Sequence, residues 1–236
     1  MTGHDHLITY YDDATGERTA LTARELGTWA AATAALLTDE CGHGPRSTAA
    51  VLLPPHWQTA AVLLGAWSAG IAVSYRDWAS AGLSPAGAPL DVTFVHRRRV
   101  DSWLDEVPIG TDQFVLSLTA SHSPSPGAPR GYRDYPAAVH PHLGAAPPSI
   151  TPAADAPATT DGTTYGAYAA VAAEMAAQRG ITRGDRVLIN AATQEQPLTW
   201  LLTPMVAGAS IVLCANLDPA KLTARMEAER ITHSFL

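Results

Sequence analysis

Six side chains suited to ligand binding follow two apolar stretches that the sequence predicts to be strands. After the first stretch the chain reads Pro-Pro-His-Trp-Gln, which places an imidazole, an indole and an amide at the start of a helix. After the second stretch, amide side chains and another tryptophan occupy the corresponding place. Ligands of open α/β sheets bind beyond the carboxyl ends of the strands, so stacking and hydrogen bonding could occur there. The ligand-binding candidates, which would line a cleft between two similar halves, are His56, Trp57, Gln58, Gln194, Gln196 and Trp200.

A structural role is the alternative for the first of these groups. A tryptophan at the start of a helix is often partly buried, with polar neighbours that support the helix end. The sequence alone leaves both interpretations of His56, Trp57 and Gln58 open.

Other site chemistry has little support in the sequence. It contains no Gly-x-Ser-x-Gly nucleophile turn, and no Gly-x-Gly-x-x-Gly follows a predicted strand. The two cysteines, Cys41 and Cys214, lack metal-site spacing, and the nearest approach to clustered ligands is His140-Pro141-His142. The sequence therefore predicts no catalytic residue and no metal site.

Composition narrows the possible partners. The chain has 236 residues, a net charge of −7 and a single lysine, Lys221, which argues against nucleic-acid or anionic-membrane surfaces. No apolar run approaches the ~18 residues of a membrane span. Residues 1–7 carry Asp5 and two histidines and do not resemble a signal peptide. We therefore expect a cytoplasmic protein with reduced thiols.

One unit organises the chain, and it occurs twice. Residues 50–73 read as an apolar strand, a Pro-Pro break, an apolar helix ending at Gly70, and a second strand. A shift of 138 positions places Gly42 on Gly180 and Gly70 on Gly208 without a gap. Two copies are too few for a solenoid, so the repeat predicts two similar subdomains.

The remaining segments fit around the two copies. Residues 22–25, Thr-Ala-Arg-Glu, form a capping box that starts a helix reaching about residue 39. Asp218-Pro219 predicts another helix start. Further predicted strands cover 7–11, 18–21, 91–96, 113–118, 186–191, 210–215 and the start of 231–236. Further predicted helices cover 100–106, 135–139, a stretch ending at 178, 198–207 and 219–230. Residues 78–89 and 121–157 read as connections.

Strands that alternate with helices predict an α/β fold with largely parallel sheets. We expect two similar, mostly parallel α/β subdomains, residues 1–150 with a proline-rich connection and residues 151–236.

The order of these segments resembles the N-terminal half of the adenylate-forming superfamily, which includes acyl-CoA synthetases. Members begin a helix with Leu-Thr-x-x-Glu-Leu, here residues 21–26, and follow it with a strand ending in Leu-Pro, here Leu53-Pro54. A later Gly-Asp-Arg-Val is matched by residues 184–187, and Ala-Gly-Ala before an apolar strand by residues 207–209. More closely, the chain resembles a family of short bacterial proteins kept at this truncated length. The resemblance implies the superfamily's two-subdomain fold.

The resemblance also identifies a degenerate phosphate loop. The superfamily's loop reads roughly Thr-Ser-Gly-Thr-Thr-Gly-x-Pro-Lys-Gly, whose glycines expose backbone N–H groups and whose lysine neutralises phosphate charge. The matching residues here are Thr160, Asp161, Gly162, Thr163 and Thr164, followed by Tyr165 at the second glycine and by Ala167-Tyr168 at Pro-Lys. A like charge at about 4 Å costs on the order of 1 kcal/mol in water, so Asp161 disfavours phosphate. The alternative role for Thr163 or Thr164 is to cap the next helix.

The superfamily's adenine loop, its Tyr-Gly-x-Thr-Glu motif with the magnesium-binding glutamate, its ribose-binding aspartate and its catalytic lysine would lie beyond residue 236. The sequence therefore favours a non-catalytic remnant, a pseudoenzyme, that acts as a protein-interaction or small-ligand-binding module. The alternative is an AMP-binding-like enzyme or nucleotide-binding subunit completed by a partner chain.

No cofactor is predicted, and ATP or AMP are the ones that the resemblance leaves open. The expected partner is an unidentified protein or small molecule, with no nucleic acid and no membrane. A homodimer is possible because a sheet edge near Leu236 could be covered by a second copy.

Overall fold

The computed structural model describes residues 6–75, 90–102, 107–119, 127–148 and 151–236. The predicted connection at 78–89 lies outside these residues. Within them the fold is α/β, with two five-stranded sheets, as the sequence predicts. Contacts divide the chain into two compact units, each built around one sheet. The helices of the described ranges include none that is long and apolar enough to span a membrane.

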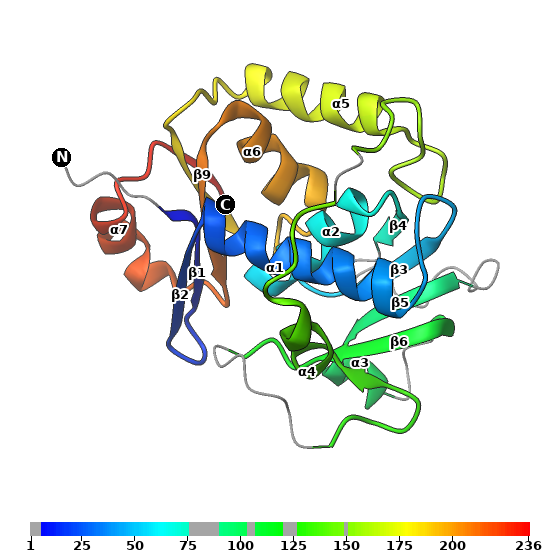
Figure 1. Cartoon of the computed structure of the whole chain (residues 1–236). Coiled ribbons are helices and arrows are strands. Elements are labelled where there is room, and N and C mark those ends of the chain that lie inside the picture. The colour runs from blue at the N-terminus through cyan, green and yellow to red at the C-terminus, as the bar shows by residue number, and fades with distance from the viewer. Residues whose placement is uncertain (1–5, 76–89, 103–106, 120–126, 149–150) are drawn as a thin grey trace. The chain divides into compact units, whose positions relative to one another are not determined.

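Sheet I is parallel throughout and has the strand order β4-β3-β5-β6-β7 (Figure 1). Its strands are β3 (Thr48–Leu52), β4 (Ala72–Tyr75), β5 (Leu90–His96), β6 (Gly110–Leu116) and β7 (Arg133–Asp134). The sheet I unit comprises Gly27–Pro54 and Gln58–Gly166. Its helical segments are α1 (Ala23–Ala35), which continues as the π-helical turn η1 (Leu36–Glu40), then α2 (Trp57–Ser68), α3 (Arg97–Val100), α4 (Tyr135–Val139) and the 3₁₀ turn η2 (His140–His142).

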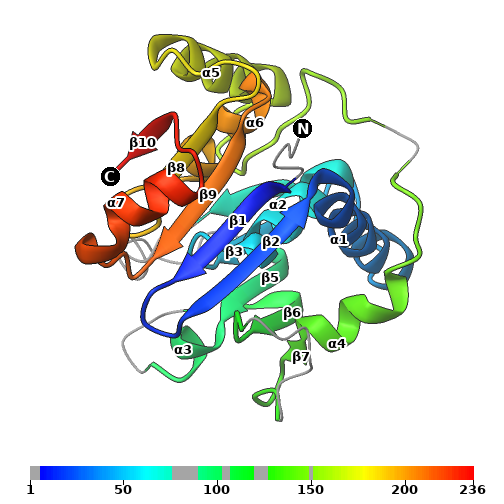
Figure 2. The same cartoon turned by 90° about the vertical axis from the view of Figure 1, so that its left-hand side faces the viewer.

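Sheet II has the order β10-β8-β9-β1-β2 and is parallel except for the β1–β2 hairpin (Figure 2). Its strands are β1 (His6–Asp12), β2 (Glu17–Thr22), β8 (Arg186–Asn190), β9 (Ser210–Ala215) and β10 (His233–Phe235). The sheet II unit comprises Met1–Leu26, Pro55–Trp57 and Ala167–Leu236. Its helical segments are α5 (Tyr165–Gln178), whose first two residues still belong to the sheet I unit, then the π-helical turn η3 (Leu198–Leu202), α6 (Thr203–Ala207) and α7 (Pro219–Ala228).

The internal repeat is visible in the strand register. In sheet I, Thr48 of β3 lies opposite Ala72 of β4, and in sheet II Arg186 of β8 lies opposite Ser210 of β9. Each residue of the second pair lies 138 positions after its counterpart in the first pair. The central strand order also repeats, since β4-β3-β5 corresponds to β9-β8-β10. The predicted duplication is therefore a duplication of structure.

The opening hairpin belongs to the second copy. Strand β1 pairs in parallel with β9, from Ile8 opposite Ile211 to Asp12 opposite Ala215. A division at residue 150 would leave this hairpin with the first half, whereas the contacts group it with Ala167–Leu236. The reason is that β1 continues the hydrogen-bonding ladder of sheet II, which sequence distance does not reveal.

Local signals set most helix ends. The Thr22 N–H donates to Glu25 Oε2 at 2.7 Å and the Glu25 N–H donates to Thr22 Oγ1 at 3.2 Å, which confirms the predicted capping box. The Asp218 carboxylate caps α7 by accepting the Ala220 N–H at 2.9 Å. The helix predicted at 100–106 was wrongly placed. Helix α3 starts at Arg97 because the His96 side chain accepts the Arg98 N–H, and residues 103–106 lie outside the described part.

Helices α1 and α2 pack closely on sheet I (Figure 1). A Cβ added to Gly65 of α2 would lie 2.5 Å from Thr33 Cβ and 2.8 Å from the Ala30 carbonyl oxygen of α1. The Thr33 hydroxyl shares a 2.7 Å hydrogen bond with Tyr135, whose ring packs edge-on against Phe94 of β5. Gly65 therefore allows α1 to approach closely enough to join this buried contact.

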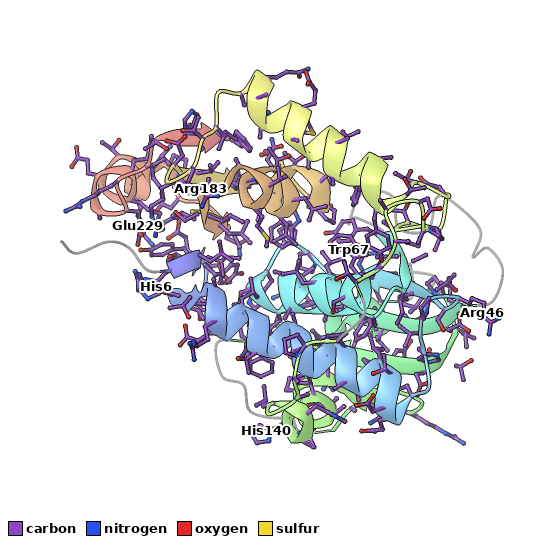
Figure 3. The ribbon with its side chains drawn as sticks, turned by 45° about the horizontal axis from the view of Figure 1, so that its top comes forward. His6, Arg46, Trp67, His140, Arg183 and Glu229 are labelled. Atoms are coloured by element: carbon purple, nitrogen blue, oxygen red, sulfur yellow. The ribbon has the colours of Figure 1, made fainter. Side chains whose placement is uncertain are left out.

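A buried carboxylate joins four strands of sheet II to α7. Glu229, labelled in Figure 3, accepts hydrogen bonds from Tyr11, Arg18 and Arg186. Arg186 also donates to Thr9 Oγ1 at 3.0 Å and to Ser210 Oγ at 3.2 Å. Burial alone would raise the pKa of Glu229, but the hydrogen bonds from Tyr11, Arg186 and Arg18 outweigh it and lower the pKa to about 2.

We expect Gly65→Ala to destabilise the protein by about 1–3 kcal/mol, because the added methyl group overpacks the α1–α2 contact. Gly27→Ala is the matched control, since Gly27 is exposed on α1 and a Cβ there meets no atom within 4 Å. Greater helix propensity should make that control up to about 1 kcal/mol more stable. Urea unfolding of both variants measures this, and equal stability changes would contradict the packing argument.

We expect stability to decline as the pH falls from the usual glutamate pKa of about 4.3 toward the folded value of about 2 for Glu229. The sign follows because the unfolded carboxyl binds its proton at a higher pH than the folded one, so acid favours unfolding.

Glu229→Gln should reduce stability at pH 7 by about 3 kcal/mol, because it leaves Arg186 buried without its counter-charge. The same variant should also lose less stability between pH 7 and pH 2 than the wild type does. Glu227→Gln, an exposed change on the same helix, should alter neither. Urea midpoints between pH 7 and pH 2 measure both effects, and an unchanged acid decline in Glu229→Gln would refute the assignment.

Candidate functional site

Residues 160–164, which the sequence predicts to be a degenerate phosphate loop, form an exposed turn held against the edge of sheet I. Val73 of β4 donates its N–H to the Ala158 carbonyl at 2.9 Å and accepts the Thr160 N–H at 3.3 Å. The side chains of Thr160 and Asp161 are exposed, and Gly162 has a φ of +91°, a conformation that favours glycine. The loop therefore lies beside β4 and is joined to that strand by backbone hydrogen bonds.

The loop's backbone N–H groups are used inside the protein. The Gly162 N–H donates to the Thr159 carbonyl at 3.1 Å, and the Thr163 N–H donates to Asp161 Oδ1 at 3.0 Å. The first two N–H groups of α5, those of Tyr165 and Gly166, donate to the carbonyls of Ala156 and Ala154 at 3.0 and 2.7 Å. In a phosphate loop, N–H groups of this kind would point at the ligand.

The Asp161 carboxylate is the acceptor of two hydrogen bonds within the loop. The donors are the Thr159 hydroxyl and the Thr163 N–H. The Thr159 hydroxyl bond and then the Thr163 N–H bond lower the pKa of Asp161 below its usual value. At neutral pH the loop therefore carries its own bound negative charge. Whether Thr163 or Thr164 also caps α5 stays a prediction.

Tyr165 fastens the loop to α2. Its hydroxyl donates to the Trp67 carbonyl at 3.0 Å, and the Trp67 indole N–H donates to the Ala158 carbonyl at 3.0 Å (Trp67 is labelled in Figure 3). Burial raises the pKa of Tyr165 to about 12, so the phenol stays protonated and can donate. The residue that replaces the superfamily's second glycine therefore has a structural role here.

Four of the six ligand-binding candidates are covered by protein. His56, Trp57 and Gln58 are 1%, 0% and 2% exposed, and Trp200 is 0% exposed. The His56 ring packs edge-on against Tyr10 at 4.3 Å, its Nε2 lies 3.9 Å from Glu17 Oε1, and burial lowers the pKa of His56. These positions match the structural alternative for the Pro-Pro-His-Trp-Gln segment.

The other two candidates, Gln194 and Gln196, follow β8. Gln194 is half-buried and Gln196 is exposed. The Gln196 carbonyl accepts the Thr199 N–H at 2.9 Å, which starts η3. A cleft shared by all six candidates stays a prediction.

Lys221, the single lysine, belongs to the sheet II unit. It lies on α7, where its ammonium is 3.3 Å from Asp13 Oδ1 and its side chain is 52% exposed. Asp13 also pairs with Arg225 at 2.6 Å. Lys221 is therefore a surface residue of the sheet II unit.

Sequence spacing missed one group of potential metal ligands, Cys41, His43 and Asp112, which belong to the sheet I unit. Asp112 is distant in sequence, so only the fold brings it to the two loop residues. Burial and then the Asp112 charge raise the pKa of Cys41 to about 11, unlike an activated cysteine nucleophile. In the His140-Pro141-His142 segment, His142 Nε2 lies 2.9 Å from Glu40 Oε2.

Comparison with known proteins identifies one relative by sequence. No family model matches the chain. A "TIGR03089 family protein" from Mycobacterium tuberculosis strain ATCC 25618 / H37Rv is 40% identical over 227 residues, which cover 95% of this chain and 89% of that protein.

Solved structures of higher divergence share the fold. The N-terminal domain of FACL13 from Mycobacterium tuberculosis matches with a TM-score of 0.69, 16% identity and coverage of 97% of this chain and 58% of that chain. An acyl-CoA synthetase from Brucella canis matches with a TM-score of 0.71 and 17% identity, and the match covers 99% of this chain and 45% of that chain. Acetoacetyl-CoA synthetase from Streptomyces lividans matches with a TM-score of 0.73 and 20% identity, and the match covers 96% of this chain and 38% of that chain. The chain therefore spans between 38% and 58% of the length of these structures.

We expect Tyr165→Phe to lower stability by about 0.5–1.5 kcal/mol, the usual net worth of one hydrogen bond. It should also speed hydrogen exchange at the Ala158 and Thr160 amides, because the loop loses one of its two links to the end of α2. Hydrogen exchange read by mass spectrometry measures this. Unchanged exchange over residues 158–164, with protection elsewhere also unchanged, would contradict the anchoring role.

Proposed function

The chain belongs to the TIGR03089 protein family, and we propose that it is a non-catalytic binding module built on the fold of the N-terminal part of acyl-CoA synthetases. Its work would be to bind a protein partner or a small ligand. The observation that carries this proposal is the closed phosphate loop, in which groups that would hold a triphosphate bind one another.

The hydrogen-bond inventory of the loop supports the proposal. Four N–H groups, those of Gly162, Thr163, Tyr165 and Gly166, have acceptors within the same segment, residues 154–163. A phosphate would have to displace these acceptors before it could bind. Replacing an internal hydrogen bond of the loop by one to phosphate gains little binding free energy, because a typical hydrogen bond contributes only about 0.5–1.5 kcal/mol. Rearranging the turn would therefore consume much of the binding energy.

The charges at the loop also support the proposal of a non-catalytic module. Asp161 holds a negative charge at the turn, and the position that the superfamily fills with lysine is Tyr168. Phosphoryl chemistry depends on positioning and on neutralising phosphate charge. A loop with an added carboxylate and without that ammonium is suited to neither. We therefore propose that the chain binds its partner through the exposed polar surface of the loop, or at Gln194 and Gln196 beyond β8.

A partner-completed nucleotide subunit is the second candidate. The observation that favours it is the retained Gly162-Thr163-Thr164 turn, which remains exposed at Gly162 and lies beside β4. A partner chain could supply the regions of acyl-CoA synthetases that this chain does not span. In that case a protein carrying a Tyr-Gly-x-Thr-Glu motif and a catalytic lysine should co-purify with the tagged chain.

We expect isothermal titration of magnesium ATP into the purified chain to give no heat, and millimolar ATP to leave the melting temperature unchanged. The double variant Asp161→Ser and Tyr168→Lys should gain measurable binding, at least tenfold tighter than wild type. It removes the internal anion, releases the Thr163 N–H and adds the missing positive charge, and each such change is worth about 1 kcal/mol.

Micromolar ATP binding by the wild type, or ATP–pyrophosphate exchange with any carboxylic acid, would overturn the proposal. Asp155→Ser with Tyr168→Lys serves as the matched control, because Asp155 is an exposed carboxylate near the loop in sequence. Equal gains in both double variants would mean that total charge, and not closure by Asp161, controls binding.

A further inference from the structure

Three side chains with different metal-binding atoms meet in the sheet I unit. One sulfur of Cys41, one ring nitrogen of His43 and one carboxylate oxygen of Asp112 all lie within 4.8 Å of one another. His43 Nε2 is 2.9 Å from Asp112 Oδ2. All three residues are partly buried, with the His43 side chain 10% exposed and the Asp112 side chain 23% exposed. The group is therefore sheltered but open to solvent.

The backbone holds these residues in place. The Cys41 N–H donates to the Leu36 carbonyl at 3.1 Å at the end of η1. Gly42 then turns the chain with a φ of +74°, and the His43 N–H returns to the Leu37 carbonyl at 2.8 Å. Asp112 lies on β6, an internal strand of sheet I. A tight turn and a central strand form a more rigid support than two loops would.

We propose that Cys41, His43 and Asp112 bind one Zn²⁺ ion. Thiolate, imidazole and carboxylate are the three ligand types of protein zinc sites, with metal–ligand distances of about 2.0–2.3 Å. Tetrahedral bonds of that length place ligand atoms about 3.3–3.8 Å apart, so these atoms need move by about 1 Å or less. A sulfur ligand disfavours Mg²⁺ and Ca²⁺, which prefer oxygen. Three protein ligands leave a fourth position open.

Charge in the group also fits a divalent cation. Zinc would displace the proton of the Cys41 thiol, and the resulting thiolate and the Asp112 carboxylate together carry two negative charges. The neighbouring cation in this structure is Arg133, whose Nη1 lies 3.7 Å from Cys41 Sγ and 3.9 Å from Asp112 Oδ1. The other end of the same guanidinium pairs with Glu40, and its plane packs over the Phe114 ring at 5.0 Å. Arg133 can therefore keep Glu40 and Phe114 as partners when zinc takes over the sulfur and the carboxylate.

This arrangement makes Arg133 a competitor of the metal. Its positive charge lies next to two of the three ligands, so it should weaken zinc binding without abolishing it. Removing that charge should tighten binding, whereas removing any ligand should weaken it. A chance cluster of polar side chains would not show these opposite effects.

The test is isothermal titration calorimetry, in which zinc chloride is titrated into the tag-free, reduced full chain. We expect one equivalent of Zn²⁺ to bind with a Kd of about 1 μM or tighter, because metal binding by a thiolate, an imidazole and a carboxylate is strong. Cys41→Ser, His43→Ala and Asp112→Asn should each weaken binding at least tenfold, and Arg133→Gln should tighten it about tenfold. Circular dichroism of each variant without metal checks that the fold is kept.

Matched controls come from the same chain. Cys214 is also a thiol beside a guanidinium, with Arg225 Nη1 3.5 Å from its sulfur, and His140 is an exposed histidine. Cys214→Ser and His140→Ala should leave zinc binding unchanged. Cobalt gives an independent readout, because a sulfur-to-cobalt charge-transfer band should appear in wild type and in Cys214→Ser but vanish in Cys41→Ser.

Three results would overturn the proposal. They are the absence of stoichiometric zinc binding, equal affinity in wild type and Cys41→Ser, and a cobalt band that survives in Cys41→Ser. The proposal is independent of the closed phosphate loop, since ATP binding at residues 160–164 would neither support nor weaken it.

Discussion

Sheet II depends on the buried carboxylate of Glu229. Strands β1 and β2 come from the start of the chain, and α7 comes from near its end, yet both contact this one side chain through Tyr11, Arg18 and Arg186. A charge so buried is costly unless several donors surround it. Glu229 has three, and Arg186 in turn reaches Thr9 and Ser210. The opening hairpin is thus required to satisfy charges that belong to the second copy of the repeat, which explains why it pairs there.

The repeat and the helix starts could be predicted because their causes are local. Glycine ends a helix, a capping box begins one, and an apolar run of five or six residues forms a buried strand whichever partner it finds. Those rules located β3, β8 and β9 and the starts of α1 and α7. The duplication then followed from a shift in numbering, and the shared register of Thr48–Ala72 and Arg186–Ser210 confirmed it in three dimensions.

Long-range pairing could not be predicted in the same way. Nothing near Ile8 indicates that its neighbour is Ile211, and nothing near Cys41 indicates Asp112. The same limit applies to the surroundings of His56, whose position after a strand predicts a ligand-binding edge. The His56 ring packs against Tyr10 and lies near Glu17, and both residues belong to the hairpin, which is distant in the sequence. A group of residues that lies in one segment, such as residues 160–164, can therefore be delimited from the sequence, whereas a group formed by two distant segments cannot.

The turn at residues 160–164 satisfies its own hydrogen-bonding groups. A glycine-rich turn before a helix leaves several N–H groups that need acceptors, and a bound anion normally supplies them. Here Asp161 and the carbonyls of Ala154 and Ala156 supply them, while Tyr165 and Trp67 tie the turn to α2. Once those acceptors are internal, the turn no longer requires a ligand for its stability. The turn keeps its place beside Val73 of β4 through backbone hydrogen bonds of its own.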